Sequence, residues 1–176
     1  ASLIRPSSFN AVYGFKPTWG ALNIGGMHPL APSQDHVGPM AVTLADAWVT
    51  ARLIAQRAGG HNGHAGLEGP LDLPVARKPA RLVRLDTLGW SQIDDSIREL
   101  FELFIAALVD AGVDIVDRRT AHKVEKLESM LLDCDNFATD IVMYEARWPF
   151  VAYIDAYGRE RAIGDTAYSR LQRGIS

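Results

Sequence analysis

One stretch constrains the fold more than any other, because it contains two short apolar segments on either side of an amphipathic one. Residues 81–85 alternate as a β-strand does, and residues 113–116 form a second short apolar segment. The intervening residues 94–111 have the apolar periodicity of a helix, and Ala111–Gly112 is a typical helix end. A strand–helix–strand unit of this length is a crossover with parallel strands and a right-handed connection. The chain is therefore predicted to be α/β, with a mixed β-sheet flanked by helices.

Composition sets limits on the class of protein. The 176 residues fit one domain or part of a larger one, and 48% apolar with 22% charged residues is an ordinary globular balance. A net charge of −3 gives no electrostatic support for a nucleic-acid partner, and none is predicted. The single cysteine, Cys134, excludes an internal disulfide framework and favours a reducing, cytoplasmic location. No apolar run approaches the ~20 residues of a membrane span, so no membrane association is predicted.

The chain divides into three parts: residues 1–57, a loop at 58–79 rich in glycine and proline, and residues 80–176. The first part is predicted to hold a short strand at 12–15, a long loop, and a helix at 43–56 that Thr43 caps. The last part is predicted to hold the crossover unit and then helices. The first of these helices spans about 123–147 and is broken by Trp148–Pro149, and the second spans 165–173.

Four ordered blocks lie near the N-terminus. Residues 2–6 place Ser2 four positions before Pro6, residues 14–18 read GFKPT, residues 33–40 read SQDHVGPM, and residues 43–47 read TLADA. In this order and spacing the chain resembles the amidase signature family of serine hydrolases. Beyond residue 56 the resemblance rests mainly on the order of elements. It implies that the chain is a central-to-C-terminal portion of an amidase-signature domain.

The resemblance also implies a mechanism and a set of site residues. Ser2 matches the nucleophile, whose hydroxyl needs a base to react. In the family that base is a buried Lys acting through a bridging Ser held by a cis peptide bond, and both are expected upstream of Ala1. We therefore expect residues 1–176 by themselves to be inactive. Lys16 lies in the signature strand end and is not the base, and neither a metal nor an organic cofactor is expected.

Two departures from the family pattern concern the residues around Ser2. Ala1 stands where the family usually has Gly, and Arg5 directly precedes Pro6. Arg5 could clamp a substrate carboxylate through two parallel hydrogen bonds, or it could form a structural ion pair with Asp35. Asp35 in turn could orient groups near the site, or accept a bond from the following backbone in an Asx turn. The sequence leaves these alternatives open.

Other candidate groups have weaker support. His61 and His64 suggest a metal ion, but the single cysteine and the glycines of that loop argue against a structural zinc site. Cys134 lies between two aspartates, which disfavour a reactive thiolate. The residues YEARWPFVAY at 144–153 carry four aromatic side chains. These either pack a helix or, as the resemblance implies, help to line the acyl-binding side of a pocket.

The favoured hypothesis is hydrolysis of a small-molecule amide through an acyl-enzyme on Ser2. One alternative is a component of a glutamine-dependent tRNA amidotransferase that has the same scaffold. The other is a binding module that keeps the scaffold and has lost the catalytic Lys. A chain that exposes apolar surface also tends to self-associate, so a homo-oligomer is a further expectation.

Overall fold

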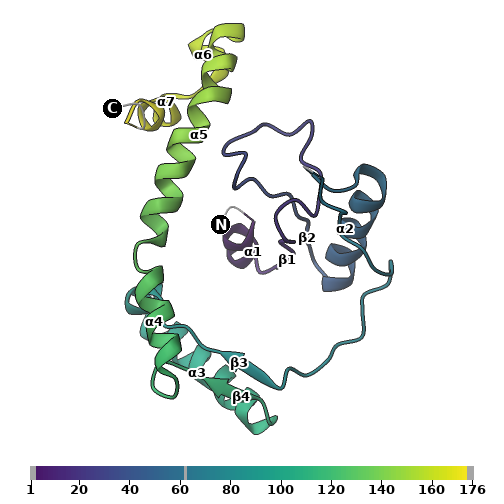
Figure 1. Cartoon of the computed structure of the whole chain (residues 1–176), viewed down its shortest axis with the longest axis vertical. Coiled ribbons are helices and arrows are strands. Elements are labelled where there is room, and N and C mark those ends of the chain that lie inside the picture. Colours follow the sequence, from purple (N-terminus) through teal and green to yellow (C-terminus); the bar gives the residue numbers. More distant parts are fainter. Residues whose placement is uncertain (1–2, 62, 174–176) are drawn as a thin grey trace. The chain divides into compact units, whose positions relative to one another are not determined.

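The computed structural model describes residues 3–61 and 63–173, which form two compact units. One unit contains residues 1–75 and 140–176, and the other contains residues 76–139. Figure 1 shows the order of the helices and strands along the chain. Among the described residues, no helix combines the length and the apolar character needed to cross a membrane.

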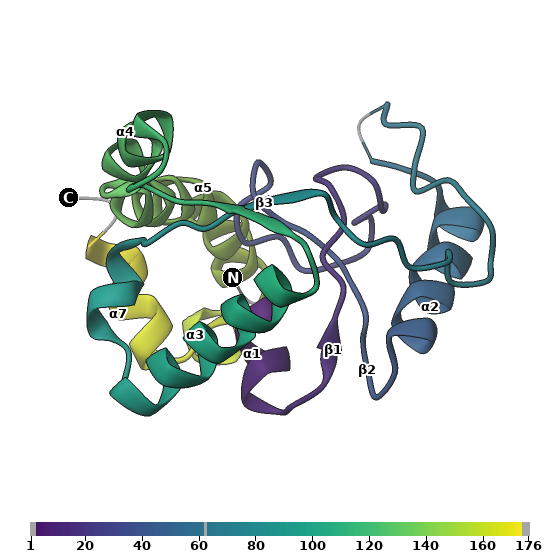
Figure 2. The same ribbon diagram turned by 90° about the horizontal axis from the view of Figure 1, so that it is seen from below.

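The first unit begins with helix α1 (Ile4–Phe9), strand β1 (Tyr13–Gly14) and strand β2 (Met40–Ala41). The two strands are antiparallel, with Tyr13 opposite Ala41 and Gly14 opposite Met40, and Figure 2 shows them beside α1. The Phe15 N–H extends the pairing by donating to the Pro39 carbonyl at 3.0 Å. This pairing brings the second and third sequence blocks together, across the long loop between them.

Helix α2 (Leu44–Ala58) forms where the sequence predicts a helix. Its N-cap is Thr43, whose hydroxyl accepts the Asp46 N–H at 3.1 Å, and it ends at Gly59 with a positive φ of 68°. One face buries Ala47, Ala51 and Ala55, the last two in a small core with Leu22. The loop after α2 folds back onto the helix, because backbone carbonyls of Gly69 and Pro70 accept hydrogen bonds from helix side chains.

The long C-terminal helices differ from the prediction. The break falls after α4 (His122–Leu131), and α5 runs from Cys134 to Tyr157 with Pro149 inside it. Pro149 cannot donate a hydrogen bond to the Glu145 carbonyl and crowds it, which is why the sequence favoured a break there. Residues on both sides of Pro149 contact the loop of residues 24–36, and we expect these contacts to offset the local cost of the proline. Two short helices follow, α6 (Arg159–Ala162) and α7 (Asp165–Arg173).

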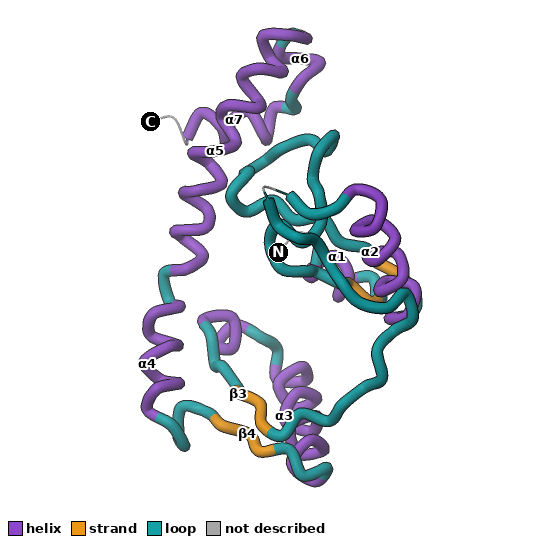
Figure 3. The backbone as a smooth tube through the Cα atoms, turned by 45° about the vertical axis from the view of Figure 1, so that its right-hand side comes forward, coloured by secondary structure: helices purple, strands orange, loops and turns teal. Residues whose placement is uncertain are grey.

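The second unit contains the predicted crossover. Strand β3 (Arg81–Val83) pairs in parallel with β4 (Asp114–Val116), and the chain between them forms a 3₁₀ turn, η1 (Leu88–Gln92), and helix α3 (Asp95–Asp110). Figure 3 shows the strands of both units in orange. The α/β class is thus confirmed, and within the described residues the parallel and antiparallel pairings lie in two separate two-stranded sheets.

Arg84, directly after β3, contacts both the 3₁₀ turn and helix α3. The Arg84 side chain, only 8% exposed, donates to both carboxylate oxygens of Glu102 on α3 at 2.8 Å, and to Asp86 at 2.9 Å. Its guanidinium carbon lies 4.7 Å from the centre of the Trp90 ring and 5.6 Å from that of Phe101. The hydrogen bonds from Arg84 lower the pKa of Glu102 below its ordinary value. Arg84 therefore links the strand end to the turn and to α3, and Arg98 on α3 adds a hydrogen bond to the Trp90 carbonyl in the turn.

Candidate active site

The backbone just after Ser2 is held by the first turn of α1. Ser2 itself lies outside the described residues, but the Leu3 carbonyl accepts two hydrogen bonds from Ser7. The Ser7 N–H donates to it at 3.2 Å and the Ser7 hydroxyl at 2.8 Å, and Ser7 is buried. The Leu3 carbonyl is thereby fixed by two donors from one residue. Helix α1 was not predicted, because a helix of this length gives no periodic signal in the sequence.

Gly14, at the end of β1, packs directly on Ser7. A Cβ atom at position 14 would lie 2.3 Å from the Ser7 hydroxyl oxygen and 2.8 Å from the Ser7 Cβ. The backbone also links the two segments, since the Val12 N–H donates to the Ser7 carbonyl at 3.0 Å. The glycine that opens the GFKPT block is therefore required by the close approach of β1 to α1.

Gly38, in the SQDHVGPM block, makes the second close approach. A Cβ atom there would lie 2.2 Å from the Phe15 carbonyl oxygen and 2.6 Å from Cδ2 of Leu3. The third block is thus in contact with the second block and with the residue that follows Ser2. The first three blocks converge at Leu3, although 35 positions separate Leu3 from Gly38 in the sequence.

Asp35 fixes the loop that leads to Gly38. Its carboxylate accepts the Leu30 N–H at 2.9 Å and the Ala31 N–H at 3.1 Å. One of the two alternatives for Asp35 was an Asx-turn bond to the following backbone. The carboxylate instead turns back onto the N–H groups four and five positions earlier. The Ala31 carbonyl completes this turn by accepting the Gln34 and Asp35 N–H groups, each at 2.7 Å.

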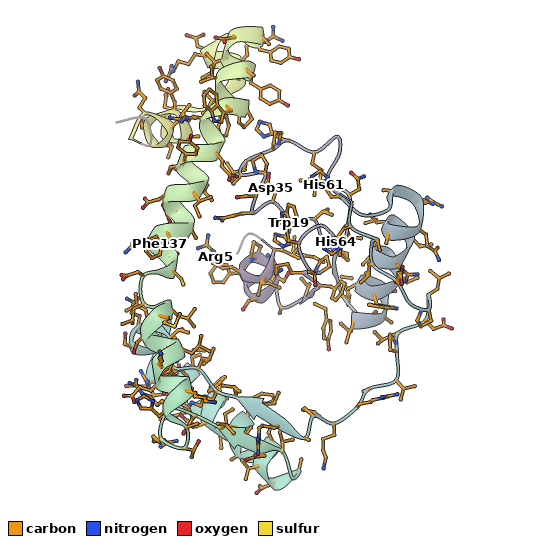
Figure 4. The ribbon with its side chains drawn as sticks, in the orientation of Figure 1. Arg5, Trp19, Asp35, His61, His64 and Phe137 are labelled. Carbon is orange, nitrogen blue, oxygen red and sulfur yellow. The ribbon has the colours of Figure 1, made fainter. Side chains whose placement is uncertain are left out.

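Arg5 lies on α1 and is exposed, whereas Asp35 lies in the loop (Figure 4). Within the part of the chain that the structure describes, no ion pair joins Arg5 to Asp35. A substrate clamp by Arg5 remains a prediction. Lys16 donates from its Nζ to the carbonyl of the next residue, Pro17, at 3.0 Å.

The two histidines of the glycine-rich loop pack around Trp19 and Gly20 (Figure 4). The His61 N–H donates to the Gly20 carbonyl at 2.8 Å, and the His61 ring meets Trp19 edge-on at 6.2 Å. The His64 ring lies against Gly20, where a Cβ would be 2.7 Å from it. Across residues 3–61 and 63–173, no three His, Cys, Asp or Glu side chains are grouped to hold a metal ion.

The loop of residues 24–36 packs on helix α5. The His28 ring stacks on Tyr153 with centres 4.6 Å apart and lies 5.4 Å from Phe150. The Ser33 N–H donates to the Glu145 carboxylate at 2.9 Å. Of the aromatic side chains in 144–153, Phe150 and Tyr153 therefore face the loop, while Tyr144 and Trp148 are exposed and stack on Arg147.

An apolar pocket of about 380 Å³ lies beside this loop. Its walls come from Leu30, from α5 and from α7, and Thr166 contributes the one hydroxyl among the lining side chains described. The α5 residues at this pocket are Val142, Met143, Ala146 and Phe150. Sequence periodicity indicated a helix here, but it could not show that a loop more than 100 residues earlier closes one side.

Comparisons with known proteins identify the family to which this chain belongs. The amidase family model matches residues 1–155, so the chain belongs to the amidase family. A crystal structure of an amidase superposes with a TM-score of 0.71 over 99% of this chain and 35% of that chain, at 22% identity, and shares the fold.

Two of the similar curated proteins have different names. Mandelamide hydrolase of Pseudomonas putida is 29% identical over 175 residues, covering 99% of this chain and 30% of that protein. A glutamyl-tRNA(Gln) amidotransferase subunit from Rubrobacter xylanophilus is 27% identical over 186 residues, covering 98% of this chain and 38% of that protein. The chain therefore spans about a third of the length of these relatives.

Proposed function

We propose that the protein hydrolyses the carbon–nitrogen bond of a small-molecule amide through an acyl-enzyme on Ser2. The observation that supports this most is the convergence of the signature blocks on Leu3, the residue next to Ser2. Ser7, Gly14 and Gly38 all contact Leu3 or the segment that holds it. A nucleophile benefits from such an anchored backbone, because a small displacement from the reactive geometry costs rate.

In the proposed reaction, the Ser2 oxygen attacks the amide carbon while a base removes the hydroxyl proton. The family resemblance implies that a Lys and a bridging Ser upstream of Ala1 do this. Backbone N–H groups stabilise the tetrahedral oxyanion, an effect of ~3–4 kcal/mol per donor in comparable sites. The C–N bond then breaks, the amine leaves with a proton, and water hydrolyses the ester to release the acid and restore Ser2. Arg5 is proposed to bind a substrate carboxylate and Asp35 to hold the adjoining loop.

The apolar pocket favours a substrate with an apolar or aryl acyl group. Its lining is aliphatic and aromatic apart from Thr166, and its volume of about 380 Å³ suits a group of benzene size or larger. Such a substrate is in keeping with the similarity to mandelamide hydrolase. The names of the amidotransferase relatives support a second candidate, a protein that releases ammonia from glutamine within a larger assembly.

The test compares Ser2→Ala with Ser8→Ala in a polypeptide that also contains the residues upstream of Ala1. Ser8 is an exposed serine on α1 and serves as the matched control. With mandelamide or another aryl amide as substrate, Ser2→Ala is expected to lower kcat at least ~10³-fold, as for other serine nucleophiles, and Ser8→Ala to leave it unchanged. Residues 1–176 alone are expected to show no turnover.

Activity retained by Ser2→Ala would refute the nucleophile assignment. Ammonia release from glutamine that requires co-purifying proteins would favour the amidotransferase alternative. A full-length protein that neither turns over amides nor acquires a covalent label at Ser2 from a serine-reactive phosphonate would favour the binding module.

A further inference from the structure

The loop of residues 24–36 is fastened to α5 by ring stacking, by an apolar contact and by a hydrogen bond. His28 stacks on Tyr153, Leu30 closes the apolar pocket, and the Ser33 N–H donates to Glu145 at 2.9 Å. The two apolar contacts allow sliding, because neither stacking nor pocket filling is strongly directional. A hydrogen bond to a carboxylate fixes both distance and direction. Glu145 therefore sets the register of this loop on the helix.

The cation nearest to Glu145 along the helix is engaged elsewhere. This cation, Arg147, lies over the rings of Tyr144 and Trp148, 4.1 and 4.8 Å from their centres. Among the residues that the structure describes, no Lys, Arg or His forms an ion pair with Glu145. The Glu145 carboxylate therefore accepts a hydrogen bond from the Ser33 N–H, 112 positions earlier in the chain, without a neighbouring ion pair among these residues.

The position of the loop on α5 is linked to the backbone beside Ser2 through Asp35 and Gly38. Asp35 closes the turn by accepting the Leu30 and Ala31 N–H groups, and we expect the segment to move as one piece. Three residues later, Gly38 is wedged between the Phe15 carbonyl and the Leu3 side chain with no room for a Cβ atom. A shift of the loop at Ser33 therefore changes the contact at Leu3.

We propose that Glu145 is a positioning residue for the reaction, and that it holds the signature loop, and through Gly38 and Leu3 the nucleophile, in the reactive position. This inference rests on the proposed function of Ser2. Glu145 acts only through the Ser33 N–H. Its expected signature is an effect on kcat that depends on a hydrogen-bond acceptor at this position rather than on a negative charge.

The experiment uses the full-length protein and compares Glu145→Ala, Glu145→Gln and Asp155→Ala. Asp155 is an exposed carboxylate on the same helix and provides the matched control. Glu145→Ala is expected to lower kcat on an aryl amide by about 10- to 100-fold, with KM changed less than about threefold, as for a misplaced reacting group. Glu145→Gln keeps an acceptor oxygen and is expected to recover kcat to within about threefold of the native enzyme.

Hydrogen exchange of residues 24–38 supplies a readout that does not depend on activity. The Ser33 amide is expected to exchange faster in Glu145→Ala, and near the native rate in Glu145→Gln and Asp155→Ala. The inference is overturned if Glu145→Ala keeps native kcat and exchange, or if Glu145→Gln is as impaired as Glu145→Ala. If Glu145→Ala does not fold, Glu145→Gln tests the inference by itself. The inference then requires that this variant has a native exchange rate at Ser33 and a near-native kcat. Activity that survives Ser2→Ala would instead refute the proposed function, while the exchange result would still report on the loop.

Discussion

Gly38→Ala is the substitution for which the structure gives the sharpest expectation. The new methyl carbon would lie 2.2 Å from the Phe15 carbonyl oxygen, whereas unstrained carbon–oxygen contacts lie at about 3.3–3.6 Å. The backbone at Phe15 must therefore move by about 1 Å, because its oxygen cannot rotate away. Gly38 does not have a positive φ, so the substitution isolates the steric effect from backbone strain.

The magnitude follows from two contributions. Overpacking of a close contact costs about 1–3 kcal/mol. The displacement also breaks the hydrogen bond from the Phe15 N–H to the Pro39 carbonyl, which contributes about 1 kcal/mol. Gly38→Ala is therefore expected to lower the free energy of unfolding of the first unit by about 2–4 kcal/mol. Urea unfolding followed by far-UV circular dichroism, together with hydrogen exchange of the β1 amides, measures this change.

Gly164→Ala is the matched control, since a Cβ atom at position 164 meets nothing within 4 Å and Gly164 does not have a positive φ. It is expected to alter the free energy of unfolding by less than about 0.5 kcal/mol, as surface substitutions do. If Gly38→Ala were as mild as this control, the β1–β2 approach would not be as close as described. The convergence of the blocks on Leu3 would then lose its support.

Two further predictions concern the second unit. Arg84→Met is expected to lower the free energy of unfolding of this unit by about 2–3 kcal/mol, which is less than the ~3–5 kcal/mol lost when a fully buried ion pair is broken, because Glu102 is half exposed. Arg84→Lys is expected to lower it by less. Hydrogen-exchange protection of the α3 amides measures both effects, and native protection in Arg84→Met would contradict the expectation. Hydrogen bonds from Arg119, and from the Thr120 and Arg119 amides, lower the pKa of Asp117 to about 2. Because the folded pKa lies below the ordinary 3.8, the stabilisation by Asp117 is complete above the ordinary value and is lost as the pH falls toward 2. Carboxyl NMR titration is expected to give a midpoint near 2, and Asp117→Asn to flatten the acid limb of stability; a midpoint near 3.8 would contradict the geometry of this turn.

The candidate site could be predicted only in part. The spacing of the four blocks identified Ser2 and Asp35 as candidates, because a motif is a pattern along the chain. Arg5 was singled out as a departure from that pattern close to Ser2. The role of Glu145 was not visible, since its partner lies 112 positions away and nothing in the residues 144–153 distinguishes a loop-holding carboxylate from an exposed one. The role of Asp35 was also left open between two alternatives. Local turn preferences favour the following backbone, but the bend of the loop brings the preceding N–H groups within reach.

The sequence by itself determined several of the local elements. The strand–helix–strand unit, the Thr43 cap and the helix of residues 44–58 follow from periodicity and capping, which depend on neighbours within about four residues. Only the tertiary structure decided that α5 continues through Pro149, that Arg84 is enclosed by aromatic rings and carboxylates, and that Gly14 and Gly38 pack against the segment after Ser2. These outcomes depend on which distant segments come into contact. The free energy of such packing outweighs local preferences, so it cannot be read from spacing along one chain.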